Sequence, residues 1–177
     1  MTPEQPKVAV LGGGAWGTAL AQMLASDGRD VTMWVLEPDV VEDINSNHRN
    51  SRFLPDAELA PTIRATGSLD EVAGAQVLLA VVPAQHLGSV LAQMPGFSGD
   101  LVICAKGIEQ ATGAIMSDVA AKACPRATLA ALSGPTFAHE VAAGLPAAVT
   151  LACGGGEDQW ERLSPVIARP AFRPYYS

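Results

Sequence analysis

The chain has 177 residues, of which 49% are hydrophobic and 16% are charged, and its formal net charge is −7. This length and composition are typical of a compact globular protein, and we expect residues 1–177 to form a single domain. The acidic balance argues against nucleic acid and anionic membranes as partners, because both bind a basic protein face.

The first predicted elements are a strand over 8–11, a glycine turn and a helix, as in a dinucleotide-binding unit. The spacing Gly12-x-Gly14-x-x-Gly17 gives each glycine a separate role. Gly12 lets the chain turn, Gly14 leaves room for a pyrophosphate, and Gly17 lets the helix and the strand approach each other. The first amides of the helix would then face the phosphates. The alternative is a glycine-rich turn without a ligand.

A second apolar strand is expected over 31–36, and Glu37 follows it, twenty residues beyond Gly17. An acid at this place meets the adenosine ribose of a bound dinucleotide, which favours the dinucleotide site over a turn without a ligand. Pro38 suits the first turn of a further helix, which we expect to end by Asn47.

Residues 48–61 mix charges, asparagines and prolines, and predict an irregular loop near the adenine side of the site. Phe53 in this loop either stacks on the adenine ring or plugs the loop against the core. A short strand over 63–65 and a short helix over 69–73 are expected to follow.

The apolar run over 76–82 is typical of a central parallel strand that is buried on both faces. It stops at Pro83, which cannot donate a hydrogen bond to a neighbouring strand. Since ligands of open α/β sheets bind at the carboxyl ends of the strands, the turn over 82–85, which contains Pro83, is expected to line the crevice. His86 is expected early in the next helix, in a structural role.

The next central strand is predicted over 101–105, and Lys106 stands at its carboxyl end. A cation there would complement a phosphorylated or carbonyl-bearing substrate, or orient the nicotinamide end of a cofactor. The alternative for Lys106 is an ordinary surface lysine. Thr112 is expected to cap a helix that begins at Gly113 or Ala114 and ends near Lys122.

A further strand over 128–132 leads into Gly134 and Thr136 at another strand-to-helix joint. Backbone amides and hydroxyl groups at such a joint can hold a small polar substrate, and Thr136 is also a candidate N-cap. His139 is expected on the exposed side of the helix that follows. The remaining predicted elements are a strand over 147–152, a glycine turn over 154–156, a helix over 158–167 and a strand over 172–175. This alternation predicts an α/β fold of the Rossmann type, a doubly wound and mostly parallel sheet with helices on both faces.

A cytoplasmic location is expected. The start of the chain has no apolar segment typical of an export signal, and the longest mainly apolar run, 77–84, is far shorter than the roughly 20 residues of a membrane-spanning helix. Cys104, Cys124 and Cys153 are odd in number and widely spaced, so we expect buried reduced thiols without a disulfide or a metal site.

Five stretches taken together resemble the amino-terminal domain of bacterial NAD(P)-dependent glycerol-3-phosphate dehydrogenases. They are GGGAWGTALA, INSNHRNSRFLPDAEL, VVPAQ, CAKGIEQATG and LSGPTFAHEVAAGLPAAV, in this order along essentially the whole chain. The resemblance implies hydride transfer between a nicotinamide cofactor and a phosphorylated triose. Dihydroxyacetone phosphate and sn-glycerol 3-phosphate would be interconverted for phospholipid synthesis.

The resemblance also implies roles for individual residues. Ala15 and Trp16 would lie beside the cofactor diphosphate, and Phe53 and Ala138 would contact the dinucleotide. Lys106 would meet both cofactor and substrate, and Gly134 and Thr136 would meet substrate.

One position departs from the family pattern. A basic residue suited to the 2′-phosphate of NADP usually stands two places after the tryptophan of the second strand, whereas this chain has Leu36 followed by Glu37. Leucine cannot pair with a phosphate and Glu37 would repel one. NAD is therefore predicted to bind more tightly than NADP.

In the family, a helical carboxy-terminal domain supplies the lysine that exchanges a proton with the substrate oxygen, and we expect this lysine beyond Ser177. Residues 1–177 are expected to be the cofactor half of a longer enzyme, with no catalytic residue of their own and little activity alone. A homodimer is a further possibility for the full-length enzyme. The competing interpretations are another NAD(P)-dependent enzyme, such as a ketopantoate reductase or a hydroxyacid dehydrogenase, and a non-catalytic nicotinamide-sensing module.

Overall fold

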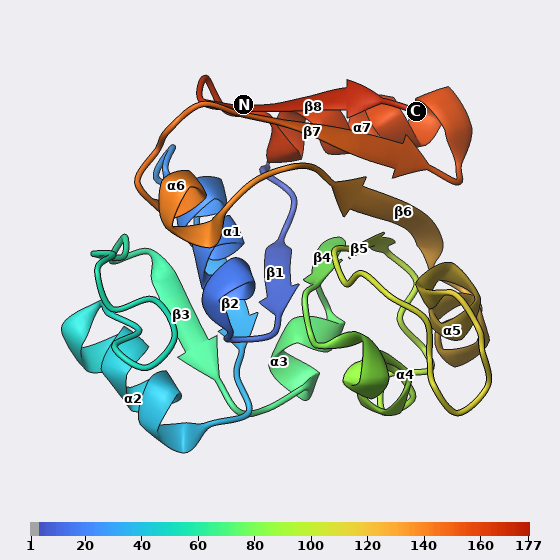
Figure 1. Ribbon diagram of the computed structural model, residues 1–177, viewed down its shortest axis with the longest axis horizontal. Coiled ribbons are helices and arrows are strands. Elements are labelled where there is room, and N and C mark those ends of the chain that lie inside the picture. Colours follow the sequence, from blue (N-terminus) through green and yellow to red (C-terminus); the bar gives the residue numbers. More distant parts are fainter. Residues whose placement is uncertain (1–3) are drawn as a thin grey trace.

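Residues 4–177, which the computed structural model describes, form an eight-stranded sheet in the order β3-β2-β1-β4-β5-β6-β7-β8, with helices on both faces (Figure 1). The strands are β1 (Val8–Leu11), β2 (Val31–Trp34), β3 (Ile63–Thr66), β4 (Val77–Ala80), β5 (Asp100–Ile103), β6 (Thr128–Ser133), β7 (Ala147–Cys153) and β8 (Phe172–Tyr176). The helices are α1 (Ala15–Ala25), α2 (Pro38–Asn47), α3 (Asp70–Ala73), α4 (Ala84–Leu91), α5 (Met116–Ala123), α6 (Ala138–Ala142) and α7 (Gly156–Ile167).

The strand order reverses beside β1. The chain passes from β1 to β2 and β3 on one side, then crosses to β4, β5 and β6 on the other. Every pair from β3 to β6 is parallel, β7 is antiparallel to β6, and β8 is parallel to β7. This confirms the predicted mostly parallel Rossmann-type sheet, whose switch point lies between β1 and β4.

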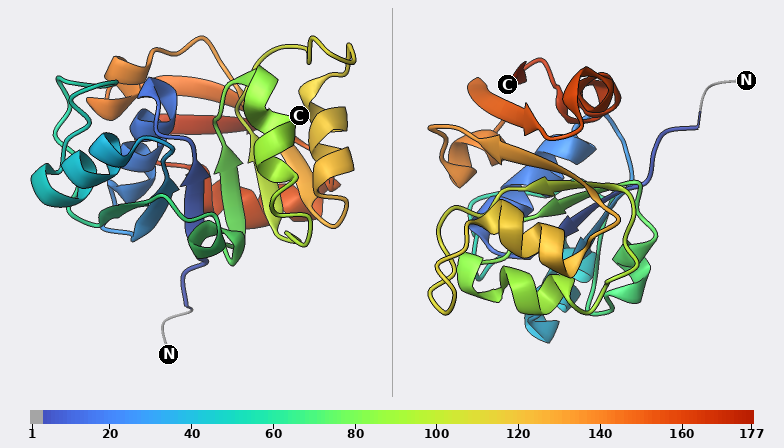
Figure 2. Two further views of the ribbon diagram at one scale, coloured as in Figure 1. Left: turned by 90° about the horizontal axis from the view of Figure 1, so that it is seen from below. Right: turned by 90° about the vertical axis from the view of Figure 1, so that its right-hand side faces the viewer.

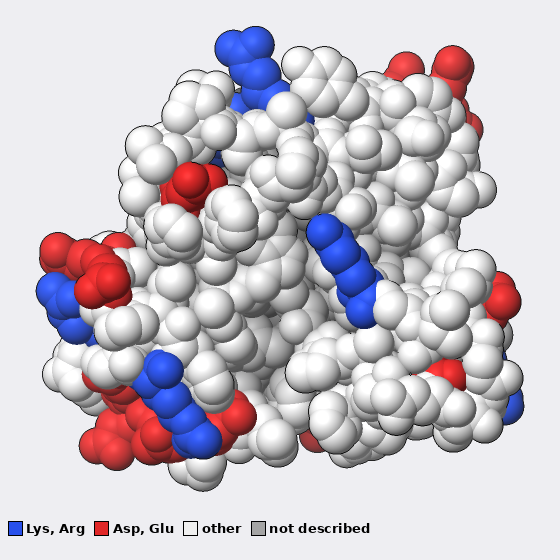
Figure 3. All heavy atoms as spheres, in the orientation of Figure 1, with Lys and Arg blue, Asp and Glu red and all other residues white. Residues whose placement is uncertain are grey.

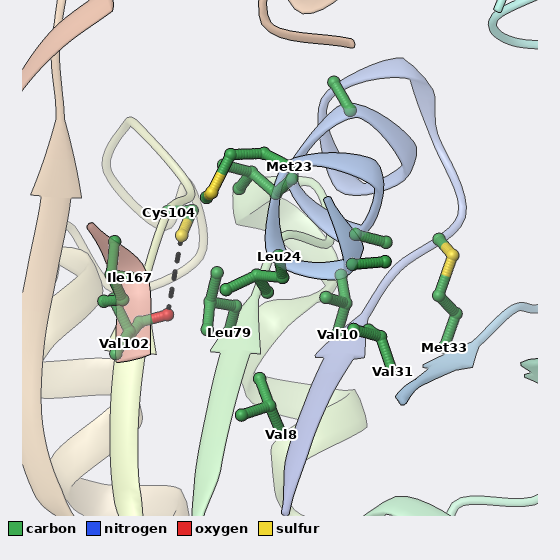
Figure 4. Close-up of a cluster of buried hydrophobic side chains, with 14 of the residues drawn as sticks. Val8, Val10, Met23, Leu24, Val31, Met33, Leu79, Val102, Cys104 and Ile167 are labelled. Carbon is green, nitrogen blue, oxygen red and sulfur yellow. Dashed lines mark hydrogen bonds between the residues drawn. The ribbon is translucent and has the colours of Figure 1, made fainter. Parts of the chain in front are cut away.

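The helices cover the two faces of the sheet separately. Side chains of α1, α2, α6 and α7 pack with one buried cluster, and those of α3, α4 and α5 pack with the other. Figure 2 shows α4 and α5 side by side. In Figure 4, Met23 and Leu24 of α1 lie over Val10 of β1 and Leu79 of β4. All residues of β1 and β4 are buried, which explains why both read as unbroken apolar runs.

Most predicted elements are present, with ends that shift by one to three residues. Two predicted helix caps are wrong. The helix expected after Thr112 begins only at Met116, because the Thr112 hydroxyl donates to Glu109 Oε2 at 2.5 Å and accepts from the Ala114 amide at 3.2 Å. The N-cap of α6 is Phe137, without a side-chain hydrogen bond, so Thr136 does not cap that helix.

The three cysteines are free, and Cys104 and Cys124 are buried as predicted, whereas Cys153, at the end of β7, is only half-buried. Burial raises the pKa of the Cys104 thiol far above its ordinary value, so this side chain stays neutral inside the sheet. Over residues 4–177, no helix combines the length and the apolar character that crossing a membrane requires.

Candidate functional site

The glycine turn follows β1 at the edge of the sheet where the parallel strands have their carboxyl ends. Gly12 has φ +127°, a conformation that L side chains rarely adopt. Its amide donates to Trp34 O at 3.0 Å, which ties the turn to the end of β2. A Cβ at Gly12 would also lie 3.0 Å from Val81 C after β4. The turn therefore needs glycine for its conformation and for its neighbours.

Gly17 has the close approach that its place in the motif predicts. A Cβ built at Gly17 would lie 2.2 Å from Gly12 O, so α1 could not begin this close to the turn with any larger residue. Gly14 differs, because its Cβ would meet nothing within 4 Å and the residue is exposed. The side of the turn at Gly14 is therefore open, as a bound diphosphate requires.

A hollow of about 270 Å³ lies beside the open turn, between the ends of β1, β2 and β4. Its walls combine small residues of the turn with side chains from the strand ends and from α4. The lining residues are Gly12, Gly13, Gly14, Trp34, Leu36, Glu37, Val81, Val82, Pro83, His86 and Val90. Figure 3 shows that the middle of this face is hollowed and carries few charged side chains. The predicted crevice is thus present at the switch point.

Leu36 and Glu37 stand where the adenosine ribose is expected. Both line the hollow, Leu36 is 71% exposed, and Glu37 is the residue before the first turn of α2. Among the described residues that line the hollow, none is lysine or arginine. The wall next to the end of β2 therefore offers a carboxylate and an apolar side chain.

Lys106, Gly134 and Thr136 come together farther along the same edge. Lys106 follows β5 and its Nζ donates to Gly134 O, after β6, at 3.4 Å. The Thr136 amide donates to the same carbonyl at 3.0 Å. None of the three lines the hollow beside the glycine turn, so they form a separate group at the ends of β5 and β6. Lys106 is exposed, and its ammonium group is accessible to a ligand.

The other predicted cofactor contacts are less exposed. Ala15 and Trp16 begin α1 and are half-buried against the core cluster. Ala138 begins α6, which packs against α1. Phe53 is also half-buried against this cluster, and the Arg52 guanidinium lies 5.1 Å from the centre of its ring. Phe53 does not line the hollow, so its position agrees with the plug and its contact with a dinucleotide stays a prediction.

The loop before β3 is fastened to α2 by Asp43. Its carboxylate accepts from Asn47 Nδ2 at 2.9 Å and from the Ser51 amide at 2.8 Å. These hydrogen bonds, led by that from Asn47, hold the pKa of Asp43 below its ordinary value. The Arg52 guanidinium lies 3.4 Å from Asp39 Oδ1, also on α2. Polar contacts therefore hold this loop against α2.

Sequence reasoning missed the roles that four residues have in the site. His86, predicted as structural, lines the hollow. Asn50 and Thr18 are buried and bond to the glycine turn, which no local pattern indicates. Gln85 holds the segment after Lys106, because it donates to Ile108 O and accepts from the Gln110 amide, both at 2.9 Å. Within residues 4–177, no group of three metal-ligating side chains is present.

Comparison with known proteins identifies relatives along the whole chain. The family described as NAD-dependent glycerol-3-phosphate dehydrogenase N-terminus matches residues 7–159. A glycerol-3-phosphate dehydrogenase (NAD(P)+) from Erythrobacter litoralis is 64% identical over 177 residues, which are 100% of this chain and 52% of that protein. A protein of the same name from Novosphingobium aromaticivorans is 63% identical over 97% of this chain and 52% of its own length.

A solved structure agrees with these sequence matches. The glycerol-3-phosphate dehydrogenase of Coxiella burnetii superposes with a TM-score of 0.89 at 31% identity. The superposition covers 98% of this chain and 54% of the solved chain. The chain thus spans about half the length of the curated relatives it matches. The proton-transfer lysine that the family resemblance places beyond Ser177 falls outside the described residues, so its assignment stays a prediction.

Proposed function

The chain belongs to the NAD-dependent glycerol-3-phosphate dehydrogenase family, whose amino-terminal part it matches, and we propose that it is the cofactor-binding half of such an enzyme. The proposed reaction interconverts dihydroxyacetone phosphate and sn-glycerol 3-phosphate. When bound, the nicotinamide ring supplies or accepts the hydride. The observation that carries the proposal is the glycine turn at the switch point, which is open at Gly14 and borders an uncrowded hollow.

The described residues fit a dinucleotide. Gly12, Gly14 and Gly17 let the backbone and the first turn of α1 approach the diphosphate, with Ala15 and Trp16 beside it. Glu37 accepts hydrogen bonds from the ribose hydroxyls at the end of β2. Pro83 lines the same hollow after β4. Amide groups therefore hold the anion, which is how an acidic protein can bind it.

The preferred cofactor is NAD. Leu36 offers no charge to a 2′-phosphate, and Glu37 on the same wall would repel one. The exposed fraction of Leu36, 71%, leaves this wall accessible to the ribose. Dissociation constants for NADH and NADPH, measured by fluorescence titration of the purified chain, test the preference. Tighter binding of NADPH would contradict it.

The triose phosphate belongs at the ends of β5 and β6. Lys106 presents a cation there, held toward Gly134 by its hydrogen bond, and Thr136 adds a hydroxyl group. Lys106 orients the substrate carbonyl and phosphate relative to the nicotinamide. The proton exchanged with the substrate oxygen is assigned to a lysine of a carboxy-terminal domain beyond Ser177.

The free thiols, of which Cys104 and Cys124 are buried, support a cytoplasmic location.

Replacement of Lys106 tests the enzymatic proposal against the alternatives. In a full-length enzyme that carries this chain, Lys106→Ala is expected to lower kcat/KM for dihydroxyacetone phosphate at least about 100-fold, because a charged contact to the substrate is lost. The dissociation constant for NADH should change by less than about threefold. Lys122→Ala, an exposed lysine on α5, is the matched control and should alter neither quantity.

Three outcomes would contradict the proposal. A Lys106→Ala enzyme with unchanged turnover would favour a nicotinamide-sensing module, which needs the glycine turn but not this lysine. Rapid NADH oxidation with dihydroxyacetone phosphate by residues 1–177 alone would show that the proton donor has been assigned to the wrong part of the enzyme. A higher kcat/KM for ketopantoate or a hydroxyacid would move the chain to another dehydrogenase class.

A further inference from the structure

Asn50 joins the loop before β3 to the glycine turn. Its side chain is completely buried, and its Nδ2 donates to Gly13 O at 2.9 Å and to Thr18 Oγ1 at 2.8 Å. Its Oδ1 accepts from the Phe53 amide at 3.1 Å. The side chain therefore uses both of its polar atoms, and its two donor bonds end on the turn and on the first turns of α1.

The bond to Gly13 O has a consequence for the next amide. In a planar trans peptide, the carbonyl of one residue and the N–H of the next point in opposite directions. Since Asn50 draws the Gly13 carbonyl toward its own buried side chain, the Gly14 N–H is turned to the other side. Gly14 is exposed and lines the hollow, so the hollow is the expected direction of this N–H. Asn50 thus sets the direction of an amide donor in the site.

Thr18 strengthens this arrangement. It is also completely buried, and its hydroxyl group donates to Gly13 O at 3.4 Å while it accepts from Asn50. The Gly13 carbonyl therefore receives two side-chain donors, one from the loop and one from α1. A peptide plane whose carbonyl is held by two side-chain donors is preorganised for an anion and loses little conformational freedom when the anion binds.

We propose that Asn50 is a positioning residue for the dinucleotide diphosphate, acting through the Gly13–Gly14 peptide. The inference rests on the proposed function, because it requires a diphosphate beside Gly14. It makes the loop over 48–61 part of the cofactor site without any contact between Asn50 and the ligand. A chain that lacks the side-chain amide of Asn50 is expected to fold, with a glycine turn that is less constrained.

The matched control is Asn45, whose side chain also makes two hydrogen bonds to backbone. It donates to Ala65 O at 2.9 Å and accepts from the Ala65 amide at 2.8 Å, and so fastens α2 to the edge strand β3. Asn45→Ala therefore removes two side-chain hydrogen bonds to backbone, as Asn50→Ala does together with a third bond, to Thr18. Only Asn50→Ala removes a bond to the turn.

Calorimetric titration of each variant with NADH and with ADP-ribose gives the decisive measurement, alongside its melting temperature. Asn50→Ala is expected to weaken both ligands by the same factor, about tenfold, because the bonds to Gly13 O and to Thr18 are lost and both ligands carry the diphosphate. Asn45→Ala should lower the melting temperature but leave both dissociation constants within about twofold of the parent chain.

A second pair of variants keeps the test decisive if Asn50→Ala does not fold. Thr18→Val removes the hydroxyl group with little change of shape and is expected to weaken both ligands about threefold, whereas Thr18→Ser keeps the hydroxyl group and the affinity. Unchanged affinity in both Asn50→Ala and Thr18→Val would overturn the inference alone. A parent chain that binds neither NADH nor ADP-ribose would overturn the proposed function, and the inference with it.

Discussion

Replacing Gly17 with alanine separates the packing role of the glycine motif from its binding role. The added Cβ would lie 2.2 Å from Gly12 O, and the backbone that carries these two atoms is held by α1 and by the sheet. An ordinary contact between these atoms is more than about 1 Å longer. Either α1 or the turn must therefore move, and neither can yield as a flexible side chain would.

The expected loss of stability follows from two opposing effects. Forcing an extra carbon into a packed interior costs about 1 to 3 kcal/mol, and contact with backbone places Gly17→Ala at or above the upper end. Alanine in a helix gains about 1 kcal/mol over glycine. The net loss is about 2 kcal/mol, which lowers the melting temperature of a chain of this size by about 4 to 8 °C.

Gly14→Ala is the matched variant, because its Cβ would meet nothing within 4 Å and its backbone suits any residue, with φ −70° and ψ −176°. Its free energy of unfolding should change by less than about 0.5 kcal/mol. The methyl group would nevertheless stand in the open side of the turn and should weaken NADH binding at least about tenfold. Thermal unfolding and NADH titration compare the two variants. Equal melting temperatures for Gly17→Ala and Gly14→Ala would refute this division of roles.

Three further predictions concern the cofactor wall, a buried carboxylate and a buried thiol. Leu36→Arg should tighten NADPH binding at least about tenfold, because a guanidinium can pair with the 2′-phosphate, and should change NADH binding less than about threefold; fluorescence titration measures both. Asp100→Ala should lower the free energy of unfolding in urea by about 2 kcal/mol, since Asp100 Oδ1 accepts from buried Gln159 at 3.0 Å and from Arg162 at 3.1 Å. Burial raises the pKa of Cys104, so its thiol stays neutral in the folded chain while it ionises in the unfolded chain above a pKa of about 8.5. The free energy of unfolding is therefore unaffected by this thiol below that pH and falls as pH rises above it. Denaturation between about pH 8 and 10 should show a slope of up to about 1.4 kcal/mol per pH unit that Cys104→Ala reduces.

The strands of the central sheet could be predicted because their sequence pattern has a direct physical cause. β1 and β4 are buried on both faces, so every residue in them is apolar and the runs stand out. The glycine spacing then located the turn, since the positive φ of Gly12 and the close approach of Gly17 to Gly12 O are local to the strand–turn–helix unit. These features depend on residues close together in sequence.

Features that depend on a choice between competing partners, or on distant partners, could not be predicted. Thr112 and Thr136 both suit an N-cap by residue type. The Thr112 hydroxyl bonds to Glu109 instead, and the N-cap of α6 is Phe137, without a side-chain hydrogen bond. The role of Asn50 in its polar loop could not be predicted because its partner, Gly13, lies 37 residues earlier. No periodicity or local motif indicates such a bond.

The distribution of charge is compatible with an anionic ligand, although the net charge of the chain is −7. In Figure 3, acidic side chains gather toward the side of the face that α2 occupies, while the hollowed middle is largely uncharged. Asp43 on α2 bonds to Asn47 and to the Ser51 amide and so orders the loop that carries Asn50. Acidic residues thus support the loop, and the loop in turn fixes the Gly13 carbonyl. In the proposed binding mode, the diphosphate would meet amide groups at short range, where their dipoles outweigh screened charges farther away.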